Sequence, residues 1–409
     1  MFHKLSSNPN NCAIHIGTTN GNKASILRCH VDTQFNSPVW ADWQTEGFVS
    51  ITTDIYKDDA QSGQCCDIFA NRALLAPRLL WWNDSNWSAT LSPYIEYEAQ
   101  SKQGFINLRE ANITYTDNNI EWLFGYGMIY WGVTEVYQPV NIVNQYDGHI
   151  SLGTEEKMGQ PMLQARWLPK WGEVQMLLLP FHQKRHFREP DQRRTLTKSV
   201  SNHPLYPDGE NKVDSAVRVS FWQDALDVAL SAFYGNSREP RLVEQTNDWL
   251  ASYAKIFQLG TELQWTQDDL LLKWESTYKS GEGKDYETLV TGFEYSVYGF
   301  SFSRGTLGLI TEYTWDNRDS SAPPTIYNND IFLGLRWKAN DIKDTEFLFS
   351  GLFDLEETSA LYKLTASGRI NKNWKWVAES YYLSAMNRNE PIAYLKNDSY
   401  FSIGAEYNF

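Results

Sequence analysis

The last eleven residues of the chain alternate strictly between apolar residues and residues that are polar or small. The apolar positions, counted back from the end, are Phe409, Tyr407, Ala405, Ile403 and Phe401. A period of two indicates a β-strand with one apolar face and one hydrated face. At the very end of a chain, such a strand is what a lipid-embedded barrel needs to close its sheet against its first strand.

Taken alone, this last strand leaves two interpretations open. Phe401, Ile403, Tyr407 and Phe409 resemble the C-terminal signal by which the barrel-assembly machinery of Gram-negative outer membranes recognises its substrates. The same alternation would also suit an amphipathic strand in a soluble β-sandwich. The rest of the chain distinguishes the two.

The aromatic content favours the membrane. The chain has 17 Trp, 23 Tyr and 20 Phe, an aromatic share of 15%, yet its mean hydropathy is only −0.50. A barrel combines these properties because lipid-facing residues alternate with lumenal ones and because Trp and Tyr gather at the membrane interfaces. No stretch approaches the roughly 18 apolar residues of a membrane helix. The chain is therefore predicted to cross a bilayer as strands.

The charge and the cysteine content of the chain limit which partners and ligands are expected. A net charge of −14 opposes binding to a phosphate backbone, so nucleic acid is not expected as a partner. Cys12, Cys29, Cys65 and Cys66 form no CxxC pair, and the seven histidines lack finger-type spacing, so we expect no metal site and no cofactor. In an outside-facing loop, Cys65 and Cys66 could pair with each other or with another thiol, although a passive loop position is favoured.

Residues 1–44 are predicted to lie outside the barrel, and residues 45–409 to form it as a single domain. The first 40 residues contain no continuous apolar run followed by a small-residue cleavage site, so no standard secretory signal is visible. We therefore expect a misassigned or truncated start, or a nonstandard leader. This segment is expected to be disordered or tucked at the mouth of the barrel.

The alternating pattern recurs along the chain and predicts an all-β, transmembrane antiparallel barrel of about 18 strands, with 16 as the alternative. Short turns follow nearly every second strand and longer connections follow the others, so both termini are expected on the short-turn, periplasmic side and the long loops outside. The predicted strands span 46–55, 72–82, 86–98, 104–116, 119–129, 161–168, 173–181, 215–221, 226–235, 259–265, 270–278, 289–297, 307–315, 329–339, 345–354, 358–369, 373–384 and 399–409.

Charged residues concentrate on the inward face of strand after strand, which indicates a polar lumen rather than a packed core. The candidate pore-lining residues are Glu262, Lys273, Glu275, Glu294, Glu312, Arg336 and Lys338. Their acidic excess predicts a mild preference for cations, unless an arginine-rich loop forms the narrowest point.

One basic cluster stands out in this acidic chain, in the connection 182–214, which we call the basic loop. Its candidate residues are Lys184, Arg185, Arg188, Arg193 and Arg194. Three interpretations are open: a solvated surface loop whose charges neutralise neighbouring acids, a bridge to the phosphates of lipopolysaccharide, or a loop that folds into the pore and attracts anions.

The segment 130–147, which we call the constriction segment, mixes apolar and polar residues and is too apolar to lie free in water. It is expected to fold inward against the barrel wall and narrow the channel, the alternative being a β-extension above the membrane. The residues singled out are Trp131, Glu135, Tyr137, Asn141 and Asn144.

Five stretches carry a resemblance to a known family. They are LREANITYTDNNIEWLFGYGMIYWG (108–132), SAFYGNSREPRL (231–242), YAKIFQLGTELQWT (253–266), FEYSVYG (293–299) and NNDIFLGLRW (328–337). Together they resemble an uncharacterised family of porin-like outer-membrane proteins of Gram-negative bacteria, similar in architecture to alginate-export and phosphate-selective porins. The resemblance implies an outer-membrane barrel and leaves the solute unnamed.

The predicted function is a channel for the passive diffusion of small polar or charged solutes. The alternative is an occluded barrel that acts as a receptor or structural envelope component without conductance. An enzyme is not expected, because the chain shows no nucleophile elbow, no phosphate-cradling glycine loop and no cluster of metal ligands. The expected partners are outer-membrane lipid, lipopolysaccharide, the barrel-assembly machinery and small solutes.

Overall fold

A computed structural model describes residues 42–65, 68–148, 156–300, 304–356, 358–384 and 393–409. The predicted N-terminal segment lies almost entirely outside the described residues. No helix in the described part of the chain is long and apolar enough to cross a membrane.

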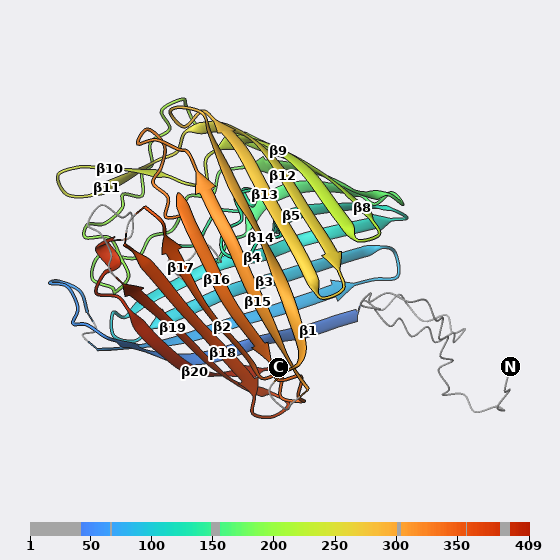
Figure 1. The fold of residues 1–409 in the computed structure, drawn as a ribbon. Helices are drawn as coiled ribbons and strands as arrows, with labels where there is room; N and C mark the ends of the chain where they lie inside the picture. Colours follow the sequence, from blue (N-terminus) through green and yellow to red (C-terminus); the bar gives the residue numbers. More distant parts are fainter. Residues whose placement is uncertain (1–41, 66–67, 149–155, 301–303, 357, 385–392) are drawn as a thin grey trace. The chain divides into compact units, whose positions relative to one another are not determined.

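The described residues form a closed antiparallel barrel of 18 strands (Figure 1). Each range predicted from the sequence overlaps one of these strands, so the predicted fold and strand number are confirmed. The barrel strands are β1 (Asp42–Tyr56), β2 (Phe69–Trp82), β3 (Trp87–Glu98), β4 (Gln103–Asp117), β5 (Ile120–Gly127), β6 (Gln160–Trp167), β7 (Gly172–Pro180), β8 (Val213–Gln223), β9 (Leu226–Asn236), β12 (Lys255–Gln267), β13 (Leu270–Ser280), β14 (Tyr286–Phe300), β15 (Gly305–Asp316), β16 (Asn329–Lys338), β17 (Glu346–Asp354), β18 (Ala360–Arg369), β19 (Trp374–Ser384) and β20 (Tyr400–Asn408).

The sheet closes where β20 pairs with β1, a junction that we call the seam. The register runs from Phe48 opposite Asn408 to Tyr56 opposite Tyr400. Every other neighbouring pair is a hairpin of consecutive barrel strands, as in β1 with β2 and β19 with β20. Closure removes the open edges that would otherwise leave backbone groups unpaired in lipid.

Among the described residues, three further elements lie in the connections. Strands β10 (Arg241–Glu244) and β11 (Trp249–Ser252) form a separate two-stranded hairpin between β9 and β12. A short 3-10 helix, η1 (Ala393–Leu395), precedes β20. In the first connection, Cys65 is disulfide-bonded rather than passive.

The outward face of the barrel is apolar, as the period of two requires. On β20, Ile403 is 51% exposed, whereas its neighbour Ser402 is 4% exposed and points inward. On β16, Leu333 is 47% exposed and Phe332 only 6%. An apolar band around the whole barrel is the surface that hydrocarbon would cover.

Aromatic side chains gather at the strand ends beside the short turns. Several of them pair across neighbouring strands, which places a belt of rings at one rim. The pairs are Trp43 with Trp81, Trp87 with Tyr115, Trp167 with Trp171, Trp337 with Phe347, and Trp374 with Tyr407. Trp and Tyr favour this position because their rings are apolar and their N–H or O–H groups can reach water.

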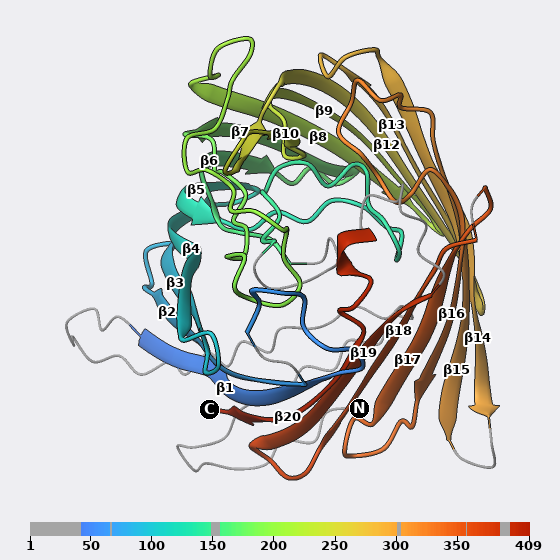
Figure 2. The same ribbon diagram turned by 90° about the vertical axis from the view of Figure 1, so that its left-hand side faces the viewer.

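The two rims differ in connection length. Two-residue turns join β4 to β5, β8 to β9 and β12 to β13, and each begins with Asn118, Asp224 or Asp268 at positive φ, a conformation that Asn and Asp tolerate. The opposite rim carries the long connections after β5, β7 and β9. Figure 2 shows the connections after β5 and β7 inside the ring of strands, so they fill part of the lumen.

Candidate functional site

The constriction segment lies inside the barrel because its apolar side chains pack on the wall. Trp131, Val140, Ile142 and Val143 are at most 5% exposed. They share one buried cluster with side chains of five wall strands, namely Met162 of β6, Leu177 and Leu179 of β7, Ala216 of β8, Phe233 of β9 and Ile256 of β12. The mixed composition of the segment follows from this position, because one side meets this apolar cluster and the other meets the polar interior.

Glu275, on β13, holds the tip of the segment through its backbone. The carboxylate accepts hydrogen bonds from the Val133 N–H at 2.6 Å, the Thr134 N–H at 2.8 Å and the Thr134 hydroxyl at 2.6 Å. Glu275 is fully buried. A carboxylate is a strong acceptor, and each such bond stabilises more than a neutral one.

Glu312, on β15, holds the next two residues in the same way. Its oxygens accept from the Glu135 N–H at 2.8 and 2.9 Å and from the Val136 N–H at 2.9 Å. On the other side of the tip, Glu262 of β12 accepts from the Gly132 N–H at 3.2 Å. Five consecutive backbone N–H groups are therefore bound by carboxylates from three wall strands.

The remaining predicted pore-lining residues form ion pairs. Arg336 bridges Glu135 of the segment, at 2.8 Å, and Glu294 of the wall, at 3.0 Å. Lys273 lies 3.8 Å from Glu294. At the short-turn end of β16, Lys338 pairs with Glu346 at 3.4 Å.

The sequence predicted that these charged residues line an open pore, but in the structure several of them are covered. Glu262, Glu275 and Glu312 are at most 3% exposed, since the constriction segment covers them. Arg336, Glu294 and Glu135 remain partly open to the lumen. The acidic excess therefore serves largely to anchor the segment, which removes the basis for the expected cation preference.

Buried side chains hold the rest of the segment in shape. Asn144 donates to the Gly127 and Met158 carbonyls at 2.9 and 2.8 Å, and its side-chain oxygen accepts from the Ile129 N–H. Lys157 donates to the carbonyls of Asn141 and Asn144. Burial lowers the pKa of Lys157 well below its usual value. These contacts lie within the connection between β5 and β6 and hold its shape without help from the other wall strands.

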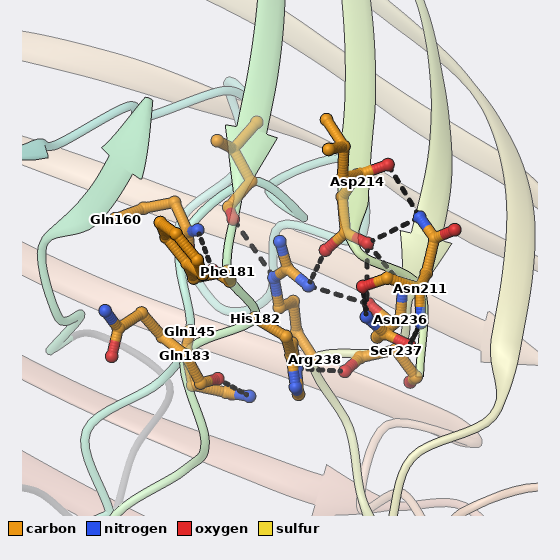
Figure 3. A network of polar contacts seen from close by, with 12 residues as sticks. Gln145, Gln160, Phe181, His182, Gln183, Asn211, Asp214, Asn236, Ser237 and Arg238 are labelled. Atoms are coloured by element: carbon orange, nitrogen blue, oxygen red, sulfur yellow. Dashed lines mark hydrogen bonds and ion pairs between the residues drawn. The ribbon is translucent and has the colours of Figure 1, made fainter. Parts of the chain in front are cut away.

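Arg238 ties the segment to β8 (Figure 3). Its guanidinium is fully buried, donates to the Val143 carbonyl at 3.1 Å and pairs with Asp214 at 2.8 Å. His182 lies beside it and contacts the Ser237 carbonyl at 3.2 Å. Burial and the nearby charge of Arg238 lower the pKa of His182 to about 3, so this imidazole is neutral at ordinary pH.

The basic loop also lies inside the barrel and reaches the seam. Arg193 is fully buried, pairs with Asp398 at 2.8 Å and donates to the Asn397 carbonyl at 2.6 Å. Arg194 lies 3.3 Å from Asp54 of β1. The guanidinium of Arg193 stacks over Tyr56 of β1, and that of Arg194 over Tyr400 of β20.

The position of these arginines corrects the solvated-loop interpretation. Arg188 pairs with Glu98 at 2.9 Å and lies 3.7 Å from Glu96, and its side chain is 2% exposed. Arg188, Arg193 and Arg194 therefore cannot reach lipid phosphates. Of the predicted basic residues, Lys184 is exposed and Arg185 lines an internal cavity.

The described residues line at least two cavities in the lumen. The outer cavity, of about 910 Å³, lies among the long connections and is lined by both the constriction segment and the basic loop. The inner cavity, of about 350 Å³, is lined by β1, β2 and β17 to β20, with hydroxyl groups from Thr52, Thr365, Ser367 and Ser402. Arg194 lines the outer cavity, Arg72 the inner one, and both pair with Asp54.

Glu239, in the connection after β9, gives the outer cavity a pH-dependent contact. It accepts from Arg318 at 2.9 Å and lies 3.8 Å from Lys279. Burial alone would raise its pKa, but these two cations outweigh burial and lower the pKa to about 2. The contact therefore stabilises the connection above the ordinary Glu pKa near 4.5, and this stabilisation is lost as pH falls towards 2.

We expect pepsin to cleave the connection 237–254 increasingly as pH falls from 4.5 to 2, after normalisation to a free peptide of the same sequence. In Glu239→Gln the connection should be cleaved readily at pH 4 as well, because the charge is already absent. Glu244→Gln is the control, since Glu244 lies in the same connection but is 60% exposed. Identical pH profiles for all three proteins would contradict the role of Glu239.

Several residues of this site were not singled out by the sequence. Asp54 and Asp398 form buried ion pairs with the distant Arg194 and Arg193, and Asp214 pairs with Arg238, 24 residues later. Asp54 and Asp214 lie on strands, at positions whose alternation places them inward. That inward placement was the available signal, but alternation does not identify the partner.

Comparisons with known proteins place the fold. No family model matches the chain, and no curated protein matches it. Among solved structures, the chain is similar to OccK5 (OpdH) of Pseudomonas aeruginosa, with a TM-score of 0.52 and 8% identity over 90% of this chain and 97% of that one. OccD3 (OpdP) of the same organism gives 0.49 and 8%, over 89% and 91%. Salmonella typhi OmpF gives 0.46 and 12%, over 90% and 97%. At 8% identity, the likeness to OccK5 shows a shared fold.

Proposed function

We propose that this chain is an outer-membrane channel of Gram-negative bacteria for the passive diffusion of small polar or charged solutes. The observation that carries the proposal is the constriction segment, which is folded into a closed barrel and anchored there by three wall carboxylates. An inward loop narrows the lumen without filling it, since the two cavities described above lie inside the barrel. A narrowed, hydrated passage of this kind admits small solutes and excludes large ones.

Membrane insertion is supported by the apolar outer face and by the aromatic belt at the short-turn rim. In this proposal the short turns are periplasmic and the long connections are extracellular. The terminal strand, with Phe401, Ile403, Tyr407 and Phe409, is the recognition element for the barrel-assembly machinery. Of the five basic residues singled out in the basic loop, Lys184 is the one exposed to reach lipopolysaccharide phosphates.

The competing function is an occluded receptor or structural barrel. The observation that favours it is the burial of the basic loop, whose arginines cross the lumen to reach the seam. Such a loop could close the passage completely. The two functions differ in conductance, because an occluded barrel carries no steady ionic current.

The test is a planar-bilayer recording of the purified barrel, together with the swelling of liposomes in sugars of increasing size. We expect discrete conductance steps and fast swelling for the smallest sugars, with a sharp decline as the sugar grows. Protein that is heat-modifiable, and therefore folded, but gives neither current nor swelling would exclude the channel and favour the occluded barrel.

A further inference from the structure

The outer cavity has an unusual excess of positive charge. Five arginines and three carboxylates line it, in a chain whose net charge is −14. Arg318 is neutralised by Glu239, at 2.9 Å, and by Asp316. Arg185 and Arg241 also line the cavity, and among the described residues neither has a carboxylate within ion-pairing distance.

Among the residues that line the cavity, the side-chain polar atoms buried without a hydrogen-bond partner are all nitrogen atoms that donate. Within the described residues, Nε of Arg185, Nε of Arg194 and Nε1 of Trp249 are buried without a hydrogen-bond acceptor. No buried side-chain oxygen of the wall is left in that state. A buried donor without an acceptor is unfavourable, so a small side-chain shift that brings these donors to the oxygen acceptors of a ligand in the cavity would relieve this cost.

The rest of the wall is rich in rings and prolines. Phe187, Trp249 and Tyr394 are half-buried, which leaves part of each ring open to the cavity. The guanidinium of Arg185 lies 5.8 Å from the centre of the Phe187 ring, so a cationic group and an apolar surface adjoin each other. A ligand that matches both would have a negative group attached to an apolar body.

We infer that the outer cavity is a binding site for small organic anions that carry an apolar ring. The oxyanion contacts Arg185, and the ring lies against Phe187 and Trp249. The inference rests on the proposed function only in naming this anion as a transported solute; the binding site itself can exist with or without conductance. An anion site here is the opposite of the cation preference that the inward acidic residues alone had predicted.

Binding can be measured on the detergent-solubilised full chain, by saturation-transfer NMR and calorimetry, with three probes. Benzoate has both the charge and the ring, acetate lacks the ring, and benzylamine has the opposite charge. We expect benzoate to bind, with acetate and benzylamine weaker by about tenfold or more, as the loss of one charged hydrogen bond or one buried ring predicts. Equal binding of benzoate and benzylamine would overturn the inference.

Two variants test whether benzoate binds in the outer cavity. Arg185→Gln and Trp249→Ala should each weaken benzoate by about tenfold while the barrel remains heat-modifiable. The matched control is Arg78→Gln, because Arg78 is a lumenal arginine paired with Glu46 and Glu110 and outside the cavity wall. Unchanged benzoate affinity in Arg185→Gln, or an equal loss of affinity in Arg78→Gln, would show that the anion does not bind in the outer cavity.

The outcomes separate this inference from the channel proposal. Conductance without benzoate binding leaves the channel intact and refutes the anion site. Benzoate binding without conductance supports the site and refutes the channel, since the barrel would then be an anion receptor.

Discussion

Replacing Glu275 and Glu312 together by alanine should raise the single-channel conductance severalfold. The two carboxylates accept hydrogen bonds from the backbone of residues 133–136, and a hydrogen bond to a charged group contributes about 1.5–3 kcal/mol. Without them the tip of the constriction segment leaves the wall and widens the passage. The measurement is a planar-bilayer recording at fixed salt. Glu275→Gln should give an intermediate result, because its amide keeps one oxygen acceptor but loses the charge.

The control for this experiment is Glu346→Ala. Glu346 is also a lumenal carboxylate, but it pairs with Lys338 at the short-turn end and does not contact the constriction segment. It therefore reports the effect of removing a charge alone. A comparable rise in Glu346→Ala, or no rise in the double variant, would show that the carboxylates do not hold the segment in place.

Ile403→Arg should sharply reduce the yield of assembled barrel. Ile403 lies in the middle of β20 on the apolar face, where it is 51% exposed. An arginine on the lipid face near the bilayer midplane costs about 2–4 kcal/mol. The strand that must pair with β1 would carry this cost at the step that closes the sheet. The measurement is the fraction of heat-modifiable protein in outer-membrane preparations.

Thr365→Arg is the matched control. Thr365 faces the inner cavity and lies directly opposite Glu379 on the neighbouring strand, so an arginine there is hydrated and can form an ion pair. Its assembly should be near normal. If both variants assemble equally well, then Ile403 does not face hydrocarbon.

The barrel could be predicted from the sequence because each strand shows the alternating pattern within its own residues. The alternation of lipid-facing and lumenal side chains is local, and β16 shows it over ten residues without reference to any other strand. The hairpin of β10 and β11 was missed because its strands have four residues each, too few to show a period, and lie in a segment predicted to be a connection.

The site was less accessible from the sequence because its contacts join distant segments. The inward position of Glu275 could be predicted, but not that a segment about 140 residues earlier would place two backbone N–H groups on it. The basic loop shows the same difficulty: its charges are visible, whereas the partner of Arg193, Asp398, is 205 residues away. Charge alone could not distinguish a solvated loop from a buried one.

The attachment of the basic loop to the seam has a consequence for how long the folded protein lasts. The seam joins the first and last barrel strands, so it is where the cylinder would begin to unzip. Arg193 and Arg194, contributed from the middle of the chain, bind Asp398 beside one of these strands and Asp54 on the other. Breaking a buried ion pair typically costs about 3–5 kcal/mol, and at least one of these pairs must break along with the backbone ladder before β1 can leave β20. Contacts that need both seam strands in place are expected to be absent from the folding transition state, so they slow unfolding without hastening folding and prolong the lifetime of each molecule once it is assembled.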